Sequence, residues 1–233
     1  MKNTSRIARS THSMTTSDVL SELLRLNTVL GSQTLPHFAL FNHSYAIVTK
    51  RILRAMEEGY FKEPQLIDAF VVTFVGYYFD ALNETSHGTL RSTSPWSKMN
   101  EYSCIASAPL FLSLLIGANA HINHDLPIAL KEFVNKNSDD HSLTDLAKIS
   151  KILMQSGIEI TASFDEPNKF YDFLKRHLRF MYYRPAMYTI LWWRVVAWKD
   201  YRRLQGNDQA ILRISKRSNK IARRLLRVAH MLS

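Results

Sequence analysis

Apolar residues recur at steps of three and four positions over long stretches of this sequence, and this spacing constrains the fold more than any other feature. In one such segment Phe38, Phe41, Tyr45, Val48 and Ile52 fall on one face of a helix. No stretch alternates apolar and polar residues as a half-buried strand does, and the 233 residues include only seven glycines and seven prolines. The sequence therefore predicts an all-α fold, a single-domain helical bundle of about seven or eight helices.

Capping residues and prolines predict where the helices begin. Ser17 is expected to cap the first helix, Pro36 and Pro64 to begin the next two, and Pro109 to begin an apolar helix at the centre of the chain. The predicted organisation is a flexible N-terminus (1–16) followed by one helical domain (17–233). Further segments are expected as an irregular region at 83–107, helices at 142–157, 168–183 and 185–205, and a basic amphipathic helix at 208–232.

The central apolar helix leads into an unusually polar stretch, where Asn119, His121, Asn123, His124 and Asp125 occur within seven residues. Buried polar groups need partners, because leaving one unpaired costs roughly 1–3 kcal/mol. His121 and Asp125 are four residues apart and share one face of a helix, so they can ligate one divalent transition metal such as zinc or iron. The sequence does not identify a third ligand; the possibilities are Asp68, Asp80, Asp145, His124 and His43.

The same stretch also has a purely structural interpretation. Pro127 removes a backbone donor, so it is expected to disturb the helix, with Asp125 capping a new helix just before it. His121 and Asn123 would then satisfy the carbonyl groups freed by the break, and His124 is expected to be exposed. The residues of this stretch are compatible with both interpretations.

Two charged residues in apolar surroundings are further candidates. Asp68 lies early in an almost entirely apolar helix, where it either supports the site or benefits from the helix dipole. Arg194 lies among tryptophans and valines, and it is expected to pair with Asp68 or Asp125 or to stack on a tryptophan. The candidate catalytic residues are thus His121, Asp125 and Asp68, with His121 and Asp125 as the metal ligands.

The positive charge is concentrated near the C-terminus. The net charge is +10, and residues 199–227 contain ten Lys or Arg against two acids. The last helix can pack on the bundle with its cations in water or contact an anionic membrane surface, whereas nucleic acid is not expected as a partner because no binding motif is present. A single cysteine, Cys104, and the lack of an apolar signal segment at the start predict a cytoplasmic protein.

Residues 117–127 also resemble the signature of a mostly bacterial helical family of unknown function (DUF5995), through the core Asn-Ala-His-Ile-Asn-x-Asp-Leu. The resemblance covers roughly residues 36–205 and supports the fold and the position of the site, but it implies no activity. Its other landmarks are residues 41–49, 59–61, 68–70, 78–82, Trp96 and 194–198. The candidate residues for a ligand site or polar network are Asn119, Asn123, Tyr45, Trp96 and Arg194.

A second resemblance is confined to residues 114–127, which are similar to the helix of zinc-dependent phospholipases C that carries a His-x-x-x-Asp pair before a proline. Only His121 and Asp125 carry over, because the other zinc ligands of that family have no clear match. Two hypotheses follow from the sequence. One is a metal-dependent enzyme, a hydrolase or oxidase; the other is a non-catalytic module that binds an apolar small molecule, a membrane surface or a protein partner.

Overall fold

A computed structural model describes residues 6–31, 35–105, 108–134, 140–164, 173, 176–177, 179–204 and 209–233. None of these residues lies in a strand, and the predicted all-α single-domain bundle is confirmed. The elements are α1 (Thr16–Val29), α2 (Pro36–Glu57), α3 (Pro64–His87), α4 (Ser97–Ser103), α5 (Leu110–Ala118), the π-helix η2 (Asn119–Asp125), α6 (Leu126–Val134), α7 (Asp140–Ala162), α9 (Arg179–Leu204) and α10 (Gln209–Leu232).

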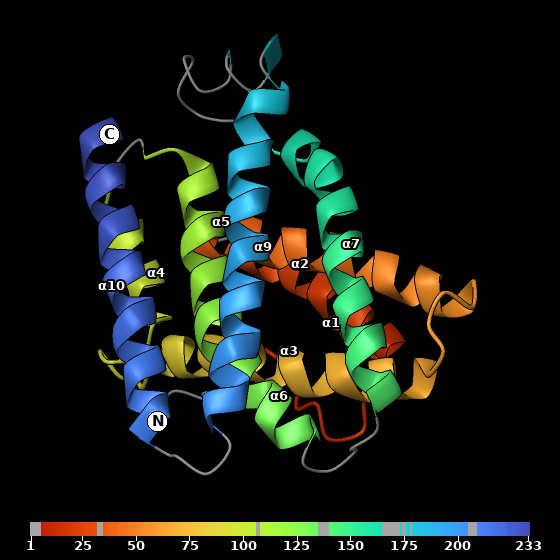
Figure 1. Ribbon diagram of the computed structural model, residues 1–233. Coiled ribbons are helices and arrows are strands. Elements are labelled where there is room, and N and C mark those ends of the chain that lie inside the picture. The colour runs from red at the N-terminus through yellow and green to blue at the C-terminus, as the bar shows by residue number, and fades with distance from the viewer. Residues whose placement is uncertain are drawn as a thin grey trace.

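Helices α5, η2 and α6 follow one another without a break and form the central rod of the bundle. In the view of Figure 1, α5, α7, α9 and α10 stand upright, while α2 and α3 cross behind them. The rod contacts α2 and α3 on one side and α9 and α10 on the other. The polar stretch of the sequence therefore lies where helices from both halves of the chain meet.

Helix boundaries follow the predicted prolines but differ elsewhere. Pro36 and Pro64 occupy the first turns of α2 and α3, as predicted. The N-cap of α1 is Thr15 rather than Ser17, because Thr15 and Asp18 form a capping box. Helix α3 continues to His87, where Gly88 ends it with a φ of 69° that favours glycine.

Two further helices differ from the prediction. Helix α4 lies inside the segment expected to be irregular, 83–107. Helix α9 passes through Pro185, which was expected to begin a helix. Pro185 is solvent-exposed, and its missing N–H removes one hydrogen bond of the helix without ending it.

The segment before α1, residues 6–15, is packed against the bundle. Ala8 is completely buried. Its backbone N–H donates to Asn83 Oδ1 (2.9 Å), and the Asn83 amide donates back to Ala8 O (3.1 Å). A side-chain amide thus pairs both backbone groups of one residue, as burial of the backbone requires.

Helix α3 supplies a large share of the core, with Tyr78 and Phe79 almost fully buried. By length and composition it is the one helix in the described ranges that could cross a membrane, and half of its most apolar stretch is buried inside the bundle. Its position against α1, α2 and α6 explains the apolar sequence, because each of these helices covers part of its surface.

Candidate functional site

The π-helix explains how the chain passes Pro127 without a break. Proline cannot donate to the carbonyl four residues earlier, and its ring collides with that carbonyl in a regular helix. Here Leu126 N–H donates to His121 O, five residues back, so the turn is wider. The carbonyl of Asn123 instead accepts from Arg217 Nη2 of α10 at 3.2 Å. The predicted hinge with a helix capped by Asp125 is therefore wrong, because a π-turn and an arginine accommodate the proline.

The Asp125 carboxylate is the centre of the site and is only 2% exposed. Its Oδ2 accepts from Trp96 Nε1 at 2.9 Å and from His121 Nδ1 at 3.2 Å. Its Oδ1 accepts from His124 Nδ1 at 2.7 Å. Burial alone would raise the pKa of Asp125, but the hydrogen bonds from the two histidines outweigh it and hold this pKa below the ordinary value. The buried carboxylate is therefore ionised at neutral pH.

His121 is held on both nitrogens and on one ring face. Because ionised Asp125 can only accept, His121 Nδ1 carries a proton, and Nε2 accepts from Tyr45 Oη at 3.1 Å. The imidazole stacks on Phe74, with ring centroids 3.7 Å apart and planes inclined by 12°. Burial lowers the pKa of His121, and the hydrogen bond to Asp125 opposes this only in part, so the ring is neutral.

The two asparagines of η2 connect the site to α10. Asn123 Nδ2 donates to Asn119 Oδ1 at 3.0 Å. Asn119 Nδ2 in turn donates to the backbone oxygen of Ser218 at 2.9 Å and contacts its Oγ at 3.1 Å. Asn123 Oδ1 is buried and has no hydrogen-bond partner among the described residues. Both asparagines therefore belong to a polar network, and this network joins η2 to α10.

His124 also faces α10, so the expectation of an exposed side chain is wrong: 19% of it is accessible. With Nδ1–H on Asp125, its Nε2 is placed to accept from Ser215 Oγ at 2.9 Å. The order of Ser215, His124 and Asp125 is that of a nucleophile, base and acid. However, Ser215 lies inside the regular helix α10. The backbone N–H groups there donate to carbonyl oxygens one turn earlier in the helix, so they are not free to stabilise an oxyanion. The contact is better interpreted as a link between helices.

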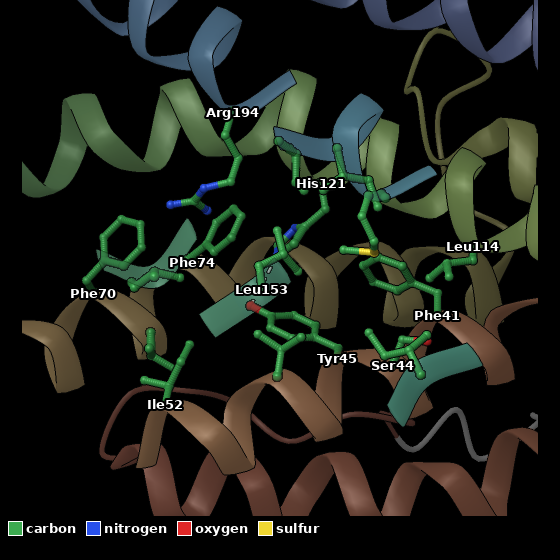
Figure 2. Close-up of a pocket in the computed structure, with 18 residues that line it drawn as sticks. Phe41, Ser44, Tyr45, Ile52, Phe70, Phe74, Leu114, His121, Leu153 and Arg194 are labelled. Atoms are coloured by element: carbon green, nitrogen blue, oxygen red, sulfur yellow. Dashed lines mark hydrogen bonds between the residues drawn. The ribbon is translucent and has the colours of Figure 1, made fainter. Parts of the chain in front are cut away.

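A cavity of about 90 Å³ opens beside His121, between α2, α3, α5, η2, α7 and α9. Figure 2 shows its wall, in which apolar side chains such as Ile52, Phe70 and Leu153 predominate. The polar groups of the wall are Ser44, Tyr45, His121 and Arg194. The site therefore combines a small apolar space with a few polar groups, the composition typical of ligand pockets.

Arg194 enters this wall from α9 and has no carboxylate partner among the residues that the structure describes. Its Nε donates to Ser150 Oγ at 2.9 Å and its Nη2 to Leu146 O at 3.2 Å, both on α7. The side chain is only 6% exposed, and burial lowers the pKa of Arg194 to about 10, so it stays charged at neutral pH. The prediction of an ion pair with Asp68 or Asp125 is wrong, because α7 carbonyl and hydroxyl oxygens take that place.

Asp68 lies apart from the cavity and does not line it. Its Oδ1 accepts from the backbone N–H of Thr16 at 2.7 Å, so it helps to hold the start of α1 against α3. Asp145 of α7 accepts from the backbone N–H of Glu63, the residue just before α3, and from Lys148 Nζ on its own helix. Within the described ranges no three His, Cys, Asp or Glu side chains gather as a metal site would require. His121 and Asp125 are therefore two neighbouring side chains of metal-ligand type, without a third such side chain beside them among the described residues.

The sequence indicated His121 and Asp125 as candidate catalytic residues and Tyr45 and Trp96 as candidates for a ligand site or polar network. The four side chains form one hydrogen-bonded chain. Sequence reasoning did not identify Phe74, although its position on the apolar face of α3 indicated burial. It also missed the serines of α10, Ser215 and Ser218, because isolated serines in a basic helix suggest a solvated face. Their spacing of three residues was the signal that they share one side of that helix.

The sequence was compared with protein families, curated proteins and solved structures. The family described as a family of unknown function (DUF5995) matches residues 16–229. No curated protein and no solved structure matches the chain. The likeness to zinc-dependent phospholipase C receives no support from these comparisons.

Proposed function

This chain belongs to the DUF5995 family, whose function is unknown, and from its site we propose a non-catalytic binding protein for a small, mostly apolar molecule. The observation that supports this most directly is the cavity beside His121, whose wall is largely apolar. About 10–15 Å³ of such space holds one water-sized group, so about 90 Å³ fits a ligand on the order of six to nine non-hydrogen atoms.

The hydrogen bonds around the cavity favour binding over catalysis. Tyr45 is engaged with His121, and His121 with Asp125, so neither presents a free group to a reacting atom. Burial and the nearby Asp125 raise the pKa of Tyr45, which keeps its hydroxyl protonated. Tyr45 and His121 are therefore neutral and paired with each other, so they can orient a ligand without exchanging protons with it.

Ligand-observed saturation-transfer NMR with 1-pentanol and toluene tests the proposal. We expect both probes to receive saturation from the protein and to compete with each other for one site. Val48→Phe, which fills the cavity from α2, should abolish the transfer, whereas Val195→Phe makes the same change at an exposed position and should not. Leu153→Phe is the second filling variant, in case Val48→Phe is poorly folded by circular dichroism. Equal transfer in the filled and wild-type proteins would contradict the proposal.

A metal-dependent hydrolase or oxidase is the second candidate. Its support is that His121 Nδ1 and Asp125 Oδ2 lie 3.2 Å apart in a buried site, where a zinc or iron ion could replace the shared proton. The hypothesis needs metal ligands beyond these two. Asp68 does not supply one, because its carboxylate accepts a hydrogen bond from Thr16 of α1 away from the cavity. Metal analysis by plasma mass spectrometry, on wild type and on folded His121→Ala, tests it. Stoichiometric metal that is lost in the variant supports an enzyme; metal-free protein after incubation with both ions rejects it.

A further inference from the structure

We propose that the ligand of the cavity carries one carboxylate, which binds to the guanidinium of Arg194 while its short apolar tail fills the space beside His121. This inference rests on the proposed binding function and specifies the class of ligand.

Every polar group of the wall other than Arg194 is already paired within the protein. Ser44 Oγ donates to Leu40 O at 2.8 Å. Tyr45 Oη donates to His121 Nε2, and His121 Nδ1 donates to Asp125. The donors of all three groups are used within the protein, so none of them offers a free N–H or O–H to an anionic ligand.

Arg194 is different because most of its donors are unused. A guanidinium has five N–H donors, and here one goes to Ser150 Oγ and one to Leu146 O. No hydrogen bond joins its Nη1 to a residue that the structure describes, and this nitrogen keeps some contact with solvent. Figure 2 shows the side chain extending from α9 towards Phe70 and Phe74, which line the cavity. The group that lacks a partner is therefore a donor, and it lies at the wall of the apolar space.

The charge of Arg194 points the same way. A cation that is nine-tenths buried without a counter-ion is costly, and both of its present acceptors are neutral oxygens. The nearest acid of the site, Asp125, already accepts from Trp96, His121 and His124. An anion brought by the ligand would supply the missing negative charge.

The geometry of the wall selects a carboxylate over a phosphate. A planar carboxylate accepts two parallel hydrogen bonds from one guanidinium. A phosphate ester carries more charge and more acceptor oxygens, but the cavity offers a single cation, and its other polar groups have no free donor. The volume of about 90 Å³ leaves room for a tail of only a few carbon atoms. The ligand class is a short-chain carboxylic acid.

Isothermal titration calorimetry with pentanoate, 1-pentanol and pentyl phosphate tests the inference at neutral pH. We expect wild type to bind pentanoate at least tenfold more tightly than 1-pentanol and pentyl phosphate. Arg194→Met should weaken pentanoate at least tenfold and leave 1-pentanol unchanged. Arg194→Lys should give an intermediate affinity, because it keeps the charge but not the fork. Arg202→Met, on an exposed turn of the same helix, is the matched control and should bind like wild type.

Each of the remaining outcomes contradicts a specific part of the proposal. Equal binding of pentanoate and 1-pentanol by wild type and by Arg194→Met overturns the carboxylate site but leaves the proposed binding function intact. Tighter binding of pentyl phosphate than of pentanoate overturns the choice of head group. Absence of binding by all three compounds overturns both this inference and the proposed function. Thermal melting of each variant without ligand confirms that it is folded, and Arg194→Met should melt within a few degrees of wild type because it removes an unpaired buried charge.

Discussion

At the scale of the residue, the buried carboxylate of Asp125 accepts hydrogen bonds from three side chains. Asp125→Asn keeps the shape but turns one acceptor oxygen into an NH₂ group that faces donors. We expect a loss of about 3 kcal/mol in the free energy of unfolding, measured by urea denaturation. Asp80→Asn makes the same chemical change at an exposed position of α3 and should cost less than about 0.5 kcal/mol. Similar losses for both variants would show that the three contacts to Asp125 contribute little.

His121 should make the stability depend on pH. Its pKa in the folded protein lies below the ordinary value of 6.5, because burial disfavours the charged ring. Between these two values the unfolded chain binds a proton that the folded chain does not, so stability falls as the pH drops below about 6.5. The loss can reach about 1.4 kcal/mol per pH unit for one proton. The stabilising contribution of neutral His121 is fully present at pH values above the ordinary pKa of 6.5.

His121→Gln removes this titration and is the appropriate comparison. The wild type should lose stability relative to the variant between about pH 6.5 and pH 5, measured by urea denaturation at each pH. Burial also lowers the pKa of His37, but that group is present in both proteins and cancels. The lowered pKa of Asp125 acts only below its ordinary value of 3.8, outside this range. Parallel pH profiles for the two proteins would mean that His121 titrates alike in the folded and unfolded states.

At the scale of the element, Gly117 allows α5 to approach α2 closely. A Cβ at this position would lie 2.7 Å from Phe41 Cδ2, and rings including those of Trp96 and Tyr78 pack around Phe41. Gly117→Ala should therefore destabilise the protein by about 1–3 kcal/mol, although alanine favours a helix by about 1 kcal/mol. Differential scanning calorimetry and urea denaturation measure the change.

Gly76→Ala in α3 is the matched control, because its Cβ would meet Thr11 Oγ1 at an ordinary 3.4 Å. It should be neutral or slightly stabilising. The double variant Gly117→Ala with Phe41→Leu should recover part of the loss, since the smaller side chain removes the collision. If Gly117→Ala proved as stable as Gly76→Ala, the close approach of the two helices would have to relax at little cost.

Local sequence signals predict most of the elements but not the π-helix. Pro36 and Pro64 begin helices because a proline fits the first turn without losing a hydrogen bond. Pro127 was expected to disturb its helix by the same local rule, yet the rod continues. What decides the outcome is Arg217, ninety-four residues away in sequence, which satisfies the Asn123 carbonyl. A contact of this kind is set by tertiary packing, so no local pattern reveals it.

The site shows the same division between local and distant information. The spacing of His121 and Asp125 predicted that they share a helix face, and they are in contact. The partner of Arg194 could not be predicted, because charge alone suggests a carboxylate, whereas the fold brings α7 oxygens to it. The cavity likewise arises from six elements and has no signature in any of them. A bound metal and a cytoplasmic location stay predictions.

At the scale of the whole molecule, α10 is attached to the bundle by a line of small and apolar side chains. Its buried positions are Ala210, Ile214, Ser218, Ala222, Leu226 and Ala229. Ile211 and Val228 lie off this line: Ile211 is only partly buried and Val228 is exposed. Small side chains allow the helix to lie close to η2, where the serines meet polar groups of the site. The cations of α10 point mainly to solvent.

This arrangement predicts how the molecule meets an anionic surface. Exposed cations along α10 form one positive face, which comprises Arg213, Lys216, Lys220, Arg223, Arg224 and Arg227. Because the apolar line of the helix is occupied by the bundle, binding to anionic vesicles should be electrostatic, without insertion. Cosedimentation with phosphatidylserine vesicles should show association at low salt that is lost near 0.5 M NaCl, where screening acts within about 4–5 Å.

Charge reversal separates this face from the overall charge. Lys220→Glu, Arg223→Glu and Arg227→Glu together should weaken vesicle binding at least tenfold, since each cation near the surface contributes about 1 kcal/mol. Reversing Lys50, Arg54 and Lys151 on α2 and α7 changes the net charge equally and should weaken it much less. Binding that survives high salt would instead require apolar contact, and the exposed Leu212 and Met231 are the side chains able to supply it. Equal weakening by both triple variants would mean that net charge, and not the face of α10, governs the association.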